Sequence, residues 1–169
     1  MSEYTLIYSD RRTMSLSVKG GVLVVRAPRR TPVSVIDSFV EKHSLWIDKH
    51  MDSERKRIEK FNKLSDADIL ELRRSAKKYL TEKTEYYSKI MNLKYGRITI
   101  TSAKTRFGSC SSKGNISYSY RLMLYPEYAR EYVVVHELAH LKEMNHSKSF
   151  YSLVQAVLPD YKERRRLLK

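Results

Sequence analysis

The sequence predicts a single α+β domain, because strand-like and helix-like patterns occupy separate stretches of the chain. Residues 4–26 contain three short strand-like runs, and in the second of them Met14, Leu16 and Val18 alternate with serines, which is typical of a strand. Residues 31–92 place apolar side chains at helical spacing instead, and further strands and helices follow. At 169 residues the chain can bury about 70% of its unfolded surface. We therefore expect one domain over residues 1–169, with a β-meander (1–30), two helices (31–92) and a catalytic core (93–169).

Local signals support each of these elements in turn. Residues 4–8, 14–18 and 22–26 have the composition of strands, and Lys-Gly-Gly at 19–21 predicts a tight turn between the last two. Thr31 followed by Pro32 is typical of a helix start.

Clearer signals for the starts of helices and strands occur from Ser65 onward. Ser65 and Asp68 have the spacing of a capping box, from which a helix should run to about residue 92. Alternation predicts strands over residues 97–101 and 116–122, and a helix should begin at Pro126. Ser147 can cap a further helix.

The segment His-Glu-Leu-Ala-His at residues 136–140 carries the clearest functional signal. Two histidines four apart project from one face of a helix, so both imidazoles can bind one Zn²⁺ ion. Apolar residues surround the motif, and buried His and Glu side chains need partners that a metal would supply. Glu137 cannot easily bind the same ion, but it can accept a proton from water and return it to a leaving amine. We expect His136 and His140 to be zinc ligands and Glu137 to be catalytic.

Two residues compete for the role of third ligand. Glu143 lies on the same helical face as His136 and His140. His146 comes after the helix should have turned at Asn145, a residue that tolerates a left-handed cap. We favour His146, because a ligand from beyond the helix end can complete a tetrahedron from another direction. Three protein ligands leave a fourth position for water, whose pKa zinc lowers to about 7.

The residues around this motif resemble a known family. Residues 133–141, residues 145–147 and Phe150 are similar to the signature of the YgjP-like zinc metallopeptidases, relatives of the SprT-like and WLM proteases. Residues 106–111 are similar to that family's Trp-Gly-Ser-Cys segment, with Phe107 where tryptophan is usual, and residues 158–162 also match.

The resemblance implies a minimal zincin-like core, in which the motif helix packs under a small antiparallel-rich sheet. One edge strand of such a sheet could accept an extended peptide as an added strand. The resemblance further implies His136, His140 and His146 as zinc ligands and Glu137 as the catalytic residue, in a metallopeptidase that acts on a protein or peptide.

The charge balance keeps other partners open. The chain has 33 Lys and Arg against 19 Asp and Glu, a formal net charge of +14. Such a surplus favours nucleic acids or nucleotides as partners, although basic clusters are also common on solvated helix faces. Two alternatives therefore remain: a metal-dependent hydrolase of nucleotide phosphoanhydrides, and a basic nucleic-acid-binding module with structural zinc. Glu137 and the presence of only three evident ligands argue against a closed structural site.

Cysteine usage and hydropathy bear on the compartment. Cys110 is the single cysteine, so no internal disulfide is possible, and we interpret it as a small packing residue rather than a metal ligand. No run of 18 apolar residues occurs, and the N-terminus lacks the pattern of a secretory signal. We expect a cytoplasmic protein that does not bind membranes.

Overall fold

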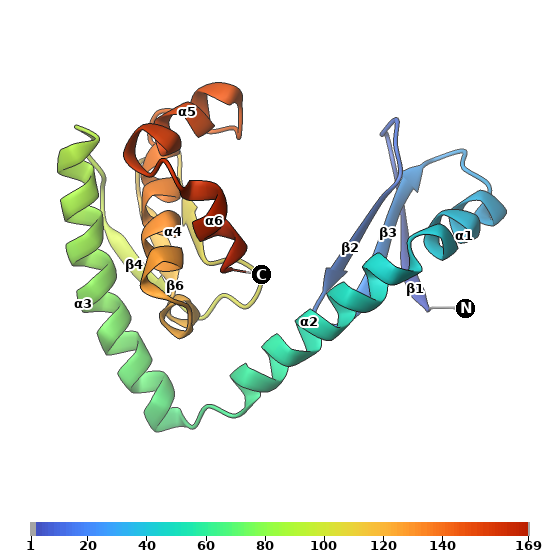
Figure 1. Cartoon of the computed structure of the whole chain (residues 1–169), viewed down its shortest axis with the longest axis horizontal. Coiled ribbons are helices and arrows are strands. Elements are labelled where there is room, and N and C mark those ends of the chain that lie inside the picture. The colour runs from blue at the N-terminus through green and yellow to red at the C-terminus, as the bar shows by residue number, and fades with distance from the viewer. Residues whose placement is uncertain (1–2, 169) are drawn as a thin grey trace. The chain divides into compact units, whose positions relative to one another are not determined.

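The computed structural model describes residues 3–168, apart from the side chain of Lys60. The described chain contains α-helices and two three-stranded sheets, which confirms the α+β class (Figure 1). It divides into two compact units, Met1–Lys63 and Leu64–Lys169, and each has its own apolar core. Our expectation of one domain over residues 1–169 did not anticipate this division, because no linker-like composition marks the boundary.

The first sheet is not the β-meander that we expected. It contains β1 (Tyr4–Ser9), β2 (Ser15–Lys19) and β3 (Val22–Pro28) in the order β1-β3-β2. Strand β1 is parallel to β3, whereas β2 is antiparallel to it. Strand β3 takes the centre because it is the most apolar of the three, with Leu23, Val25 and Ala27 all buried.

The long helix expected after this sheet is two helices, α1 (Val33–Lys42) and α2 (Ser44–Asn62). The break occurs at His43, whose backbone leaves the helical region with φ −109° and ψ 18°. Its Nδ1 atom lies 2.7 Å from the carbonyl oxygen of Phe39. With α3 the region 31–92 therefore holds three helices rather than two, and the sequence had no Gly or Pro to indicate the break.

The second unit begins with α3 (Asp66–Ile90), as the capping box predicted. The Ser65 hydroxyl accepts a hydrogen bond from the Asp68 backbone, and the Asp68 carboxylate accepts one from the Ser65 backbone. The helix ends just before Asn92, which adopts a left-handed φ of 50°.

The second sheet contains β4 (Ile98–Thr101), β5 (Gly108–Cys110) and β6 (Ile116–Ser119) in the order β4-β6-β5. One pairing is parallel and one antiparallel, so this sheet is mixed rather than antiparallel-rich. Strand β5 lies between the strands predicted over residues 97–101 and 116–122, in a segment where we predicted no strand. The strand predicted over residues 116–122 stops at Ser119, where the 3-10 helix Tyr120–Leu124 begins.

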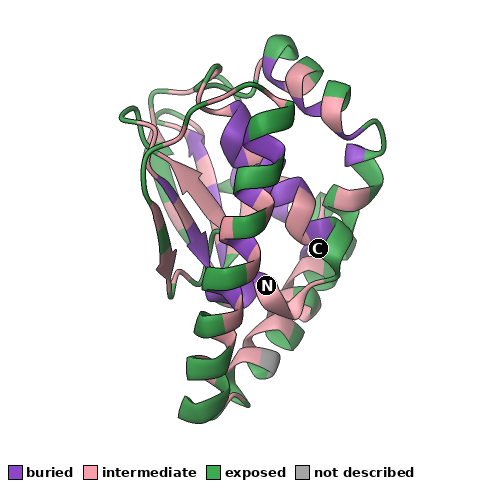
Figure 2. Ribbon diagram, turned by 90° about the vertical axis from the view of Figure 1, so that its left-hand side faces the viewer, coloured by how far each residue is buried: buried purple, intermediate pink, exposed green. Residues whose placement is uncertain are grey.

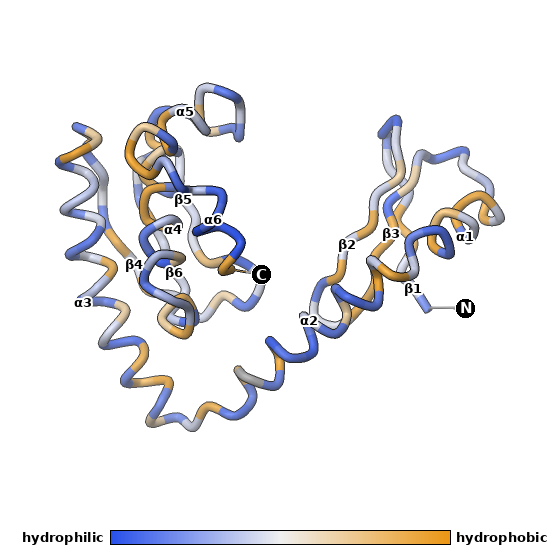
Figure 3. The backbone as a smooth tube through the Cα atoms, viewed as in Figure 1, coloured by the Kyte–Doolittle hydropathy of each residue, from blue (hydrophilic) through white to orange (hydrophobic). Residues whose placement is uncertain are grey.

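Helix α4 (Glu127–Ala139) forms the centre of this unit, against which α5 (Lys148–Val157) and α6 (Tyr161–Arg166) pack. Most residues in its second half are buried, and Figure 2 shows that buried residues (purple) gather in the interior while the outer faces of the helices are exposed (green). Helix α6 is almost entirely hydrophilic (blue in Figure 3), so apolar contact alone does not explain its attachment to α4. No helix in the described part of the chain is long and apolar enough to span a membrane.

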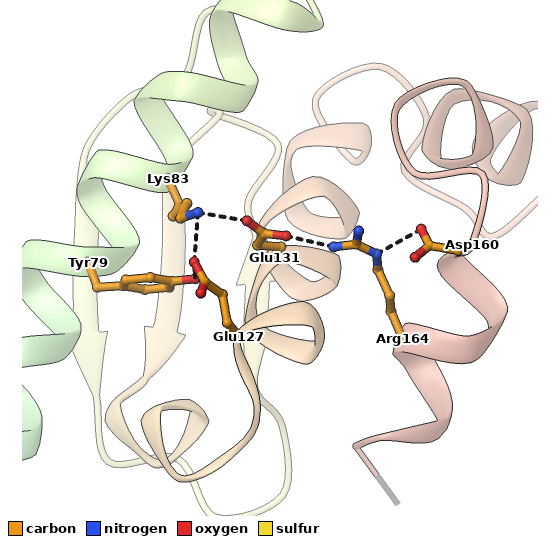
Figure 4. Close-up of polar contacts among 6 residues, drawn as sticks. All are labelled: Tyr79, Lys83, Glu127, Glu131, Asp160 and Arg164. Carbon is orange, nitrogen blue, oxygen red and sulfur yellow. Dashed lines mark hydrogen bonds and ion pairs between the residues drawn. The ribbon is translucent and has the colours of Figure 1, made fainter.

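Ion pairs attach α3 and α6 to opposite sides of α4 (Figure 4). The Glu131 carboxylate of α4 accepts hydrogen bonds from Lys83 Nζ at 2.7 Å and from Arg164 Nη1 at 2.6 Å. Arg164 also contacts Asp160 at 2.8 Å, and Lys83 contacts Glu127 at 2.9 Å. This network fixes the helix that carries the histidine motif.

Candidate metal centre

The end of α4 determines where the motif histidines point. His136 lies in the last turn, and His140 is the C-cap with right-handed helical geometry. Beyond it the chain tightens, because the backbone amides of Leu141 and Lys142 donate to carbonyls three residues earlier at 3.0 and 3.1 Å. The prediction that the helix continues to a left-handed Asn145 is wrong: among the described non-glycine residues, positive φ occurs at Asn92.

Three histidines converge just past this helix end. One ring nitrogen from each of His136, His140 and His146 can be chosen so that all three lie within 4.8 Å of one another, a group that could hold a metal ion. The Nε2 atoms of His136 and His146 are 3.1 Å apart. Two nitrogen ligands of a tetrahedral zinc ion, each at about 2.0–2.1 Å from it, would be roughly 3.3 Å apart. The donor set and its spacing therefore fit zinc.

Phe150 of α5 supports all three imidazoles. Its ring centre lies 4.8 Å from that of His136, 4.6 Å from His140 and 4.9 Å from His146. Helix α5 starts immediately after His146, since the Ser147 hydroxyl accepts a hydrogen bond from the Phe150 amide. The predicted cap at Ser147 is thus confirmed, and it holds His146 next to the motif helix.

Contacts made by the Nδ1 ring atoms orient two of the histidines. His140 Nδ1 lies 3.0 Å from the backbone carbonyl oxygen of Glu143, and His136 Nδ1 lies 3.3 Å from the Tyr132 hydroxyl. A proton on Nδ1 of His140 satisfies that carbonyl and leaves Nε2 free to bind a metal. Glu143 therefore meets the site through its backbone, and its carboxylate is not in the histidine group found among the described residues.

The protonation state of the histidines suits metal binding. Burial, together with smaller contributions from repulsion by His140, His146 and Arg165, lowers the pKa of His136 to about 3. The pKa of His146 is lowered by the same kinds of effect, with burial the largest. Both imidazoles are consequently neutral at pH 7, as metal coordination requires.

Glu137 is buried beside these histidines without a hydrogen-bond partner on Oε2, and the residue is only 5% exposed. Burial raises its pKa to about 8, while the positive charge of Arg106 acts in the opposite direction. An unpaired buried carboxyl oxygen is costly unless it has a partner. The site therefore favours a bound water or substrate group near Glu137.

Gly108 is a functional residue that our sequence analysis did not single out. A Cβ atom at this position would lie 2.5 Å from Glu137 Oε1 and 2.7 Å from its Cδ, both far inside contact distance. Glu137 can occupy its place only because residue 108 has no side chain. The signal available in the sequence was the glycine within residues 106–111, the segment that resembles the family.

A cavity of about 280 Å³ joins these groups. Strand β5 brings three residues to its wall, and the motif and the loop after it bring the others. The lining residues are Gly108, Ser109, Cys110, His136, Glu137, His140, Met144 and His146. Burial and the nearby Glu137 raise the pKa of the Cys110 thiol, so it is protonated at neutral pH and poorly suited to react.

The fold and this histidine cluster define a candidate metallopeptidase, and comparison with known families gives the same class. The model of the YgjP-like, metallopeptidase domain matches residues 55–169. The chain therefore belongs to the YgjP-like metallopeptidase family.

Solved structures with similarity to this chain include two archaeal proteins. The metallopeptidase zymogen of Pyrococcus abyssi abylysin is 27% identical, with a TM-score of 0.49 over 53% of this chain and 90% of that one. The metallopeptidase zymogen of Methanocaldococcus jannaschii jannalysin is 19% identical, with a TM-score of 0.47 over 53% of this chain and 92% of that one. No curated protein sequence matches this chain.

Proposed function

We propose that this protein is a zinc-dependent peptidase, with His136, His140 and His146 as ligands and Glu137 as general base. The observation that supports the proposal best is the unpaired Glu137 carboxyl in a cavity shared with His136, His140 and His146. Zinc in such a site would supply a water of lowered pKa, about 7, and would polarise a carbonyl group.

Glu137 has the properties that proton transfer at this site requires. Its free Oε2 lies beside the cavity and, in the ionised state, can accept a proton from water, and burial of the carboxyl favours the protonated state that then forms. The same carboxyl can then donate the proton to the departing amine. The absence of a side chain at Gly108 leaves room for the carboxyl beside the cavity, where it could both receive and release the proton.

Strand β5 offers a place for the substrate backbone. It pairs with β6 on one side and is an edge strand of its sheet, and it lines the cavity with Gly108, Ser109 and Cys110. An extended peptide could add to this edge as a further strand. The substrate class is accordingly a protein segment without fixed structure.

The test measures turnover of zinc-loaded protein on an unfolded protein and on nucleoside triphosphates in parallel. We expect peptide cleavage, and Glu137→Gln should retain zinc while losing activity by about 10² to 10⁴. Hydrolysis of the triphosphates alone would instead support the phosphoanhydride alternative. Zinc binding without turnover of either, together with salt-sensitive nucleic-acid binding, would support a structural zinc module.

A further inference from the structure

A second cavity, of about 200 Å³, adjoins the histidine cavity. The two share Gly108, His136 and Glu137 in their linings, so they meet at the proposed general base. The lining of the second cavity is otherwise aromatic or aliphatic. Its residues are Phe107, Gly108, Tyr132, Val133, His136, Glu137 and Leu168.

Three separate segments build this apolar wall. Val133, 4% exposed, comes from α4, and Phe107 precedes β5 with its ring 4.8 Å from that of Tyr125. Leu168 comes from the turn after α6, where its amide donates to the Arg165 carbonyl at 3.2 Å. Because α6 is held to α4 through Arg164 and Glu131, the turn that carries Leu168 is fixed relative to Val133.

We propose that this cavity binds a large apolar side chain of the substrate, on a residue next to the cleaved bond. The inference rests on the proposed peptidase function and adds its specificity. A carbonyl placed between the histidines and Glu137 would put a neighbouring side chain within reach of the second cavity, since the two cavities share those residues.

The size of the cavity selects among apolar side chains. At roughly 30 Å³ for each water-sized unit, the cavity corresponds to about seven heavy atoms, which is the size of a phenylalanine side chain, and the smaller leucine and methionine side chains also fit within it. Alanine would leave most of the space empty, and tryptophan would exceed it.

The local charge disfavours basic side chains. Arg165 lies close enough to lower the pKa of His136, and Arg106 close enough to lower that of Glu137. A lysine or arginine side chain entering from this region would lose hydration against Phe107 and Val133, and repulsion by both guanidinium groups would oppose its attraction to the Glu137 carboxylate.

The test uses octapeptides of Gly and Ser that differ in one residue, which is Ala, Leu, Phe, Trp or Lys. With zinc-loaded protein we expect kcat/KM for the Leu and Phe peptides to exceed that for Ala and Lys by at least about 10-fold. Cleavage should occur at a bond beside the variable residue, as mass spectrometry of the products would show. Equal cleavage of all five peptides would overturn the inference.

Two matched variants connect this preference to the cavity. Leu168→Trp should fill the space, reduce the Leu-to-Ala ratio of kcat/KM to within about threefold of unity, and leave zinc content unchanged. Leu167→Trp is the control, because Leu167 is 44% exposed, precedes it directly and does not line the cavity. An unchanged ratio in Leu168→Trp, or an equal loss in Leu167→Trp, would contradict the assignment.

Binding separates this inference from the proposed function. The same peptides are titrated against zinc-loaded Glu137→Gln, which is expected to bind without cleaving. Tighter binding of Leu and Phe peptides by the variant, when the native protein cleaves none of them, would support the cavity assignment and refute the peptidase proposal. Cleavage of all the peptides with no preference in rate or binding would support the peptidase proposal and refute the cavity assignment. If the peptides are neither cleaved nor bound with a preference, both the peptidase proposal and the cavity assignment are overturned.

Discussion

The position of the Glu137 side chain depends on the glycine at residue 108. The carboxyl lies where a side chain at residue 108 would be, and its Oε2 atom has no partner in the described structure. A glycine can be required for backbone conformation or for space, and its φ at position 108 is outside the left-handed region. Space is therefore the requirement here.

Gly108→Ala should displace the Glu137 carboxyl and lower kcat/KM by at least about 10², because a mispositioned general base loses most of its effect. Zinc content should stay the same, since no histidine is among the atoms nearest the new Cβ. Ser112→Ala is the control, because Ser112 lies exposed in the turn after β5 and lines neither cavity. In a Glu137→Gln background the Gly108→Ala change should cost much less, and full additivity of the two losses would argue against this pairing.

His146 and Glu143 are the two candidates for the third zinc ligand. His146 lies 3.1 Å from His136 through their Nε2 atoms, whereas Glu143 contributes a backbone carbonyl that alanine would retain. We expect His146→Ala to weaken zinc binding by more than about 100-fold and Glu143→Ala to change it by less than about 10-fold. Competition with a coloured chelator measures both. Strong zinc loss in Glu143→Ala with little loss in His146→Ala would reverse the assignment.

At the scale of elements, the packing of α4 against α3 and α6 depends on ion pairs along its two sides. Glu131 is the central group, because its side chain is 12% exposed and it bonds both Lys83 of α3 and Arg164 of α6. Each cation has a second carboxylate partner, Glu127 or Asp160, so loss of Glu131 would weaken the network without leaving either charge unpaired.

Glu131→Ala should therefore lower the free energy of unfolding by about 1–3 kcal/mol, less than the 3–5 expected when a buried charge loses its single partner. Urea denaturation of the zinc-loaded protein measures the change. Glu85→Ala is the control, because Glu85 pairs with Lys89 on an exposed face and should cost less than about 1 kcal/mol. Equal effects of the two changes would show that Glu131 has no special role in attaching α6.

The elements that sequence analysis predicted well are those with local determinants. The Ser65 capping box, the Ser147 cap and the spacing of the histidine motif all depend on residues a few positions apart. Pairing of β1 with β3 was missed because it is non-local, and β5 was missed because Gly108–Cys110 lacks an apolar alternation. Helix α4 ends early because backbone hydrogen bonds tighten the chain after His140, and no residue there, such as Gly or Pro, indicates a helix end in the sequence.

At the scale of the whole molecule, the two compact units have separate cores. The core of Met1–Lys63 contains Leu23, Val25 and Ile36, whereas that of Leu64–Lys169 contains the buried face of α4 and Phe150. The proposed ligands belong to the second unit alone. Metal binding should consequently stabilise one unit directly, since a ligand stabilises the folded state to which it binds.

Removal of zinc should lower the unfolding temperature of the second unit and leave that of the first nearly unchanged. At a free zinc concentration 100 times its dissociation constant, the loss is about 2.7 kcal/mol. Hydrogen exchange resolves the two units: chelation should speed exchange in α4 and α5, next to the histidines, and leave β3 protected. Accelerated exchange in β3 to the same extent would mean that the units unfold together and that the histidine site stabilises the entire chain.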